Sequence, residues 1–180
     1  MKTLIAALTA VFLFAGVDVP YMNTDNTVND KVLEYIEDNP YALVSTDFGV
    51  VSIEKSDIEM LAKLIWGEAR GVNNKAEQAA VAWCVLNRVD AGFGPDIKSV
   101  ITAPSQFTGY KSSNPVTEEL YDLAYDVLLR WELEKMGIDD VGRTLPAGYF
   151  YFSGSGGRNY FRTGSKNSSY WDWSLPDPYV

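Results

Sequence analysis

Three stretches of this chain repeat apolar residues at helical spacing, and this periodicity constrains the fold more than any other feature. The first follows Ser56 and predicts a helix over about residues 57–70. The second begins at Asn74, a typical helix start, and its apolar stripe stops at Gly92. The third, over residues 117–136, is the longest amphipathic pattern of the chain. The sequence therefore predicts a fold that is mainly α-helical.

A short fourth helix and a different C-terminal segment complete this expectation. Gly94-Pro95-Asp96 opens a helix over residues 97–101, with Pro95 suited to its first turn. The last forty residues are rich in Gly, Ser, Tyr, Phe and Trp, which favours extended segments. With 180 residues and 47% hydrophobic content, the chain can bury one good core. We expect a single compact helical domain over residues 55–180, with a short β or extended, aromatic-rich C-terminal segment.

The N-terminal residues are expected to direct the protein out of the cell. Residues 1–17 are apolar after Lys2, and the run is shorter than the roughly 20 residues of a membrane helix. This pattern predicts a signal peptide with a cleavage region near Ala15 and Gly16, and an uncleaved membrane anchor is the alternative. Residues 18–54 are interpreted as a linker and N-terminal extension. We therefore expect a protein that is secreted or held at the cell envelope, with no stable membrane span after signal removal.

Charge and composition exclude several classes of function. The net charge of -9 and the pI near 4.5 argue against a nucleic-acid partner, which requires a basic surface. The chain has no histidine, which excludes Ser-His-Asp and Cys-His catalysis and the usual catalytic zinc sites. The single cysteine, Cys84, lies in an apolar helical pattern and is expected in the core. We expect neither a metal site nor a cofactor.

Carboxylates, hydroxyls, amides and aromatic rings remain for chemistry, and a glycosidase works with these groups alone. Glu68 is the carboxylate that the pattern singles out, because it stands seven residues after Leu61 and three after Ile65. Its side chain therefore projects from or beside the buried stripe of the first helix. The alternative is that Glu68 only pairs with Arg70 or Arg88.

Several blocks of sequence resemble the cell wall hydrolase family of the spore cortex-lytic enzyme type. The resemblance covers about residues 58–173 and departs from the family pattern at Val72, at Ser153 and in a longer loop before Gln78. The matching blocks are Leu64-Ile65-Trp66-Gly67-Glu68-Ala69-Arg70-Gly71, Glu77-Gln78-Ala79-Ala80-Val81, Val85-Leu86-Asn87-Arg88-Val89, the helix and loop over 97–107, and the aromatic segment over 149–152.

This resemblance implies a lysozyme-like, mostly helical fold that cleaves peptidoglycan between N-acetylmuramic acid and N-acetylglucosamine. The glutamate of the Gly-Glu-Ala-Arg motif, which is Glu68 here, is then the catalytic acid. A hydrolase would need a second carboxylate, and Glu77, Asp90 and Asp96 are nearby in sequence without a comparable motif. A single glutamate favours a lytic transglycosylase; a true muramidase and a non-catalytic peptidoglycan-binding domain are the alternatives.

Supporting residues have both a functional and a structural interpretation. Gln106, Phe107, Tyr149 and Tyr151 are the candidates for substrate binding, although Phe107 is of a type more often found in a core. Arg70 and Arg88 are expected to be structural, and the tail that contains Trp171 and Trp173 is either a sugar platform or a staple to the core. The expected partner is the glycan strand of peptidoglycan, bound by a monomer.

Overall fold

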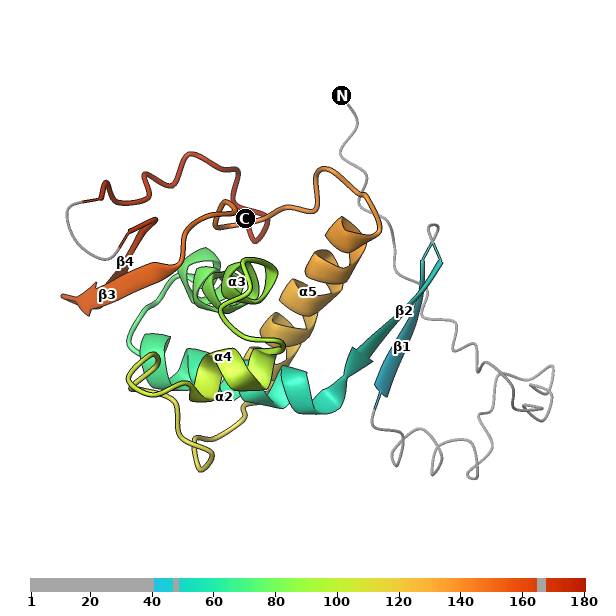
Figure 1. The fold of residues 1–180 in the computed structure, drawn as a ribbon, viewed down its shortest axis with the longest axis horizontal. Coiled ribbons are helices and arrows are strands. Elements are labelled where there is room, and N and C mark those ends of the chain that lie inside the picture. Colours follow the sequence, from blue (N-terminus) through green and yellow to red (C-terminus); the bar gives the residue numbers. More distant parts are fainter. Residues whose placement is uncertain (1–40, 47–48, 165–167) are drawn as a thin grey trace. The chain divides into compact units, whose positions relative to one another are not determined.

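The computed structural model describes residues 41–46, 49–164 and 168–180, which divide after Lys55 into two units (Figure 1). In the first unit, β1 (Tyr41–Thr46) pairs antiparallel with β2 (Gly49–Glu54). These residues belong to the predicted linker and N-terminal extension, and several of them are β-branched residue types that favour strands. The expected signal peptide and the rest of that linker lie outside the described residues.

The second unit confirms a mainly helical domain with a small C-terminal β-hairpin. It contains α2 (Lys55–Ala69), α3 (Lys75–Asp90), α4 (Ile97–Thr102) and α5 (Glu118–Lys135), followed by β3 (Tyr151–Ser155) and β4 (Arg158–Arg162). Within the described part of the chain, no helix is both long and apolar enough to cross a membrane.

Helix α3 forms the centre of this unit. Every residue from Ala79 to Leu86 is 0% exposed, so this part of the helix is covered on all sides and not along one stripe only. It contacts both α4 and α5. Because α3 is enclosed, the polar residues near its two ends, Glu77, Asn87 and Arg88, are buried as well. Their hydrogen bonds therefore determine how the loops around the helix are held.

Side-chain caps set the starts of α3 and α4, and Thr117 caps α5 in the same way. Asn74 accepts a hydrogen bond from the Glu77 amide at 2.7 Å and so caps α3, as the sequence predicts. Asp96 is the N-cap of α4, which places Pro95 before the helix and not in its first turn. The first helix begins at Lys55, directly after β2, so that Ser56 lies within α2 and is not its cap.

The C-terminal hairpin turns tightly and carries two buried side chains. Its register pairs Tyr151 with Arg162 and Ser155 with Arg158. The turn between the strands is Gly156-Gly157, with φ values of 61° and 75° that suit glycine. Phe161 is 1% exposed and Asn159 is 3% exposed, so β4 is the strand that faces the domain.

Candidate active site

Glu68 lies in the last turn of α2 with its side chain partly exposed. Its Oε1 accepts a hydrogen bond of 2.7 Å from the backbone N–H of Gly109, which belongs to the loop between α4 and α5. Within the described residues, Oε2 accepts no hydrogen bond. One oxygen of the carboxylate is thus fixed, and the other remains available for proton transfer.

The loop approaches α2 so closely that both contact positions require glycine. A Cβ atom on Gly109 would lie 2.5 Å from the carbonyl oxygen of Gly67 and 2.9 Å from Cδ of Glu68. A Cβ atom on Gly67 would lie 2.0 Å from the carbonyl oxygen of Gly109. Asn114 reinforces this contact, because its Nδ2 donates to the carbonyl oxygens of Lys63 at 3.0 Å and Gly109 at 2.9 Å. The backbone itself therefore positions the Glu68 carboxylate.

Asn159 of β4 joins Glu68 to Glu77. Its side-chain Nδ2 donates to the backbone carbonyl of Glu68 at 3.4 Å, and its backbone N–H donates to Oε1 of Glu77. Glu77 is 3% exposed and lies 3.8 Å from the guanidinium of Arg158. The hairpin is thereby attached to the end of α2 and to the start of α3.

The three carboxylates considered as a second catalytic group all have structural partners. Glu77 binds the Asn159 amide, and Asp90 accepts from the Trp131 indole N–H at 3.0 and 3.1 Å. Asp96 caps α4, and its hydrogen bonds with Ser99 lower the pKa of its carboxyl group. None of these three is presented as a free base beside Glu68.

Asn87 and Arg88, at the other end of α3, hold the C-terminal segment and the loop after α4. Asn87 donates to the carbonyl oxygens of Pro146 at 2.9 Å and Tyr149 at 3.1 Å, and its Oδ1 accepts from Arg143. Arg88 donates from Nε to the carbonyl oxygen of Phe150 at 2.7 Å. These contacts engage both residues in the fold.

The predicted substrate-binding residues are mostly held around Arg88. Gln106 is exposed, but its Oε1 accepts from Arg88 at 3.0 Å. Phe107 is 6% exposed, with the Arg88 guanidinium 4.6 Å from its ring centre. Tyr151 also lies against Arg88, at 5.4 Å, whereas Tyr149 packs edge-on against Trp171 at 5.4 Å. Both tyrosines remain partly exposed.

Sequence reasoning did not identify Gly109, Asn114 or Asn159. These residues contact α2 from positions 41, 51 and 91 residues away, and no local pattern marks such pairs. The one available signal was the placement of a glycine in the polar loop after Gln106, which indicates a close backbone approach only once the partner is known.

Comparison with known proteins identifies one family. A family model described as Cell Wall Hydrolase matches residues 73–175, which is more than half of the chain. The match includes α3, the loop that contains Gly109 and the C-terminal hairpin, and it begins after Glu68. No curated protein and no solved structure matches this chain significantly.

Proposed function

Because this chain belongs to the cell wall hydrolase family, we propose that it is an enzyme that cleaves peptidoglycan between N-acetylmuramic acid and N-acetylglucosamine. The family acts on the cell wall, so the activity is extracytoplasmic. The observation that carries the proposal is the Glu68 carboxylate, which is partly exposed, fixed through Oε1 and open at Oε2. Glu68 is the catalytic acid.

In this proposal the two oxygens of the Glu68 carboxylate have different roles, which the hydrogen bond to Oε1 supports. The Gly109 N–H donates to Oε1, so the proton of the neutral acid resides on Oε2. From there it is transferred to the glycosidic oxygen as the bond to the anomeric carbon breaks. The departing N-acetylglucosamine leaves with a hydroxyl group, and an oxocarbenium-like centre develops on the muramic acid.

We infer that the reaction is completed by the substrate itself, as in a lytic transglycosylase. The C6 hydroxyl of the muramic acid attacks the anomeric carbon, and the ionised Glu68 accepts the hydroxyl proton. This route needs one carboxylate, which agrees with the structural roles of Glu77, Asp90 and Asp96. A hydrolytic muramidase would need a second base, and Glu77 is only 3% exposed, with its Oε1 on the Asn159 amide and its Oε2 facing Arg158.

Mass spectrometry of the soluble fragments tests the reaction type. Purified peptidoglycan is treated with the wild-type protein, with Glu68→Gln and with Glu119→Gln, which changes an exposed glutamate on α5. We expect 1,6-anhydromuropeptides, lighter by one water than hydrolysis products, from the wild type and Glu119→Gln only. Products with reducing ends would establish the muramidase. Glycan binding without any Glu68-dependent product would establish the non-catalytic domain.

A further inference from the structure

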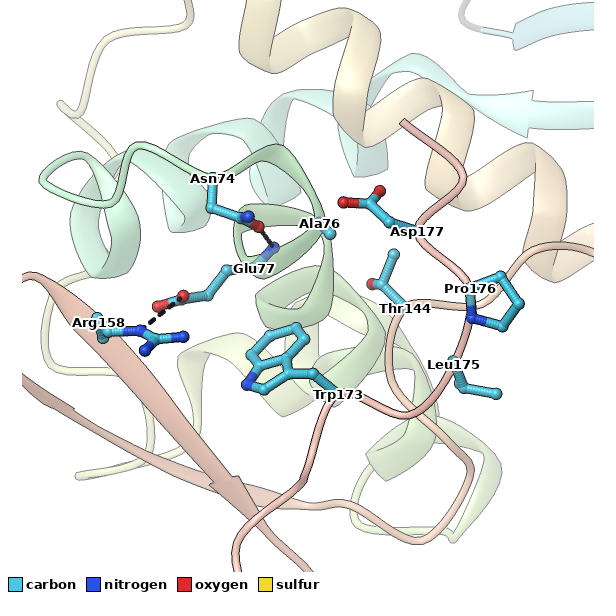
Figure 2. A pocket seen from close by; sticks show the side chains of 9 residues that line it. All are labelled: Asn74, Ala76, Glu77, Thr144, Arg158, Trp173, Leu175, Pro176 and Asp177. Atoms are coloured by element: carbon cyan, nitrogen blue, oxygen red, sulfur yellow. Dashed lines mark hydrogen bonds and ion pairs between the residues drawn. The ribbon is translucent and has the colours of Figure 1, made fainter. Parts of the chain in front are cut away.

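A cavity of about 320 Å³ lies between the start of α3 and the C-terminal segment (Figure 2). Glu68 does not line it. Trp173 supplies an aromatic wall, and the polar lining comes from Asn74, Glu77, Thr144, Arg158 and Asp177. The cavity therefore combines two carboxylates, one guanidinium and a hydroxyl around a space large enough for an amino-acid side chain.

Three features of the lining indicate a ligand and not simple packing. Thr144 is 3% exposed, and its hydroxyl has no hydrogen-bond partner in the part of the chain that the structure describes. Figure 2 shows this hydroxyl on the side of the cavity. Oε2 of the buried Glu77 has its ion-pair partner at 3.8 Å, beyond hydrogen-bond distance. Trp173 has a φ of 60°, an unfavourable backbone conformation for a bulky residue.

We propose that this cavity binds the zwitterionic end of a diamino acid in the peptide stem of peptidoglycan, of the diaminopimelate type. The ammonium group is placed by the Asp177 carboxylate, and the carboxylate group by Arg158, which lies beside Glu77 on the opposite side of the cavity (Figure 2). The methylene chain packs on the Trp173 indole, and the Thr144 hydroxyl completes the hydrogen bonding. Two carboxylates against one guanidinium select a cationic group over a neutral sugar.

The position of the cavity suits a stem attached to the sugar that Glu68 cleaves, so the inference rests on the proposed function. Asn159 contacts Glu77 in the cavity wall and the backbone carbonyl of Glu68. The diamino acid is the third residue of the stem, and an extended peptide advances about 3.3–3.6 Å per residue. It therefore lies on the order of 10 Å from the muramic acid, so it meets the protein outside the cleavage site itself.

Calorimetric binding to the Glu68→Gln protein tests the site without turnover. The probe is L-alanyl-γ-D-glutamyl-meso-diaminopimelate. The comparison peptide has L-lysine as its third residue and therefore lacks the carboxylate beside the side-chain ammonium group. We expect Thr144→Val to keep the melting temperature and to weaken binding of the first peptide about tenfold, because valine preserves the shape without the hydroxyl. Asp177→Asn should weaken both peptides by a similar factor, since it removes a charge that both ammonium groups need.

Two matched comparisons complete the test. Arg158→Gln should remove the preference for the diaminopimelate peptide over the lysine peptide. Asp139→Asn, which removes a carboxylate from the neighbouring cavity of about 340 Å³, should leave both affinities unchanged. Equal binding by all variants, or binding of an N-acetylglucosamine oligomer and not of the peptide, would overturn the proposal. Peptide binding by a protein that cleaves no glycan would instead reject the proposed function and retain this site.

Discussion

Two helix ends carry the residues by which the sequence resembles cell wall hydrolases, and they are built in opposite ways. At the end of α2, the carboxylate of Glu68 makes one hydrogen bond among the described residues, to the Gly109 amide, and the side chain remains partly exposed. At the end of α3, Asn87 and Arg88 are 3% and 4% exposed and bind backbone carbonyls more than fifty residues away. Residues that match the family equally well thus differ in their burial and in their hydrogen bonds.

The two helix ends are connected through the loop between α4 and α5. Arg88 holds the loop after α4 through Gln106, and the same loop presents the Gly109 amide to Glu68. Arg88 at the end of α3 therefore helps to position the loop that contacts Glu68 at the end of α2. We expect substitutions at the α2 end to lower activity and substitutions at the α3 end to lower stability.

The largest effect is expected for Glu68→Gln. Glutamine keeps an oxygen that accepts from the Gly109 amide but cannot donate the catalytic proton. We expect kcat on peptidoglycan to fall by about 10²–10⁴-fold, the usual contribution of a general acid. Thermal unfolding should stay within about 0.5 kcal/mol of the wild type. A large loss of stability would mean that Glu68 belongs with Asn87 and Arg88 as a structural residue.

Gly109→Ala should come next, because it keeps the carboxyl group of Glu68 but displaces the amide that holds it. The new Cβ would lie 2.5 Å from the Gly67 carbonyl oxygen, so the loop must shift. A misplacement of this kind lowers kcat/KM by about 10²-fold. Gly71→Ala is the matched control, since a Cβ there meets no atom within 4 Å. Equal activity of the two variants in a turbidity assay would contradict the role of the Gly109 contact.

Arg88→Met tests the scaffold side of the comparison. It removes the donors to the Phe150 carbonyl and to Gln106 from a residue that is 4% exposed. We expect the free energy of unfolding in urea to fall by about 2–4 kcal/mol. The exposed Arg70→Met should change it by no more than about 0.5 kcal/mol. If Arg88→Met lost activity with its stability intact, Arg88 would act on substrate and not on the fold.

The helices were predictable from the sequence because their signals are local. Asn74 and Thr117 cap α3 and α5 where the apolar patterns begin, and the predicted spans agree with the observed helices within a few residues. The start of α2 was predicted two residues too late, at about residue 57, because β2 ends at Glu54 and the helix follows at once. The capping pattern at Ser56 could not reveal this, because nothing local distinguishes it from a true N-cap.

The site was predictable only in part. Glu68 was singled out by its motif and spacing, and its role stays a prediction. The residues that position it could not be found, because Gly109 and Asn159 reach α2 through contacts that depend on the complete fold. Phe107 shows the converse limit: its motif suggested substrate contact, and the structure buries it beneath Arg88. A motif marks a position without stating whether its side chain faces the core or the cleft.

The smallest effect concerns Cys84, one turn before Arg88 on α3. Burial raises the pKa of its thiol from 9.0 to about 12, although the nearby Arg88 charge lowers it. At pH 8 only about one thiol in ten thousand is ionised, so iodoacetamide should label the unfolded protein and not the native one. The unfolded state releases this proton at lower pH, and stability should therefore fall as the pH rises from about 9 to about 12. In Cys84→Ala, this part of the alkaline decrease in the free energy of unfolding should be absent. Rapid labelling of native Cys84 would contradict the closed packing of the α3 end.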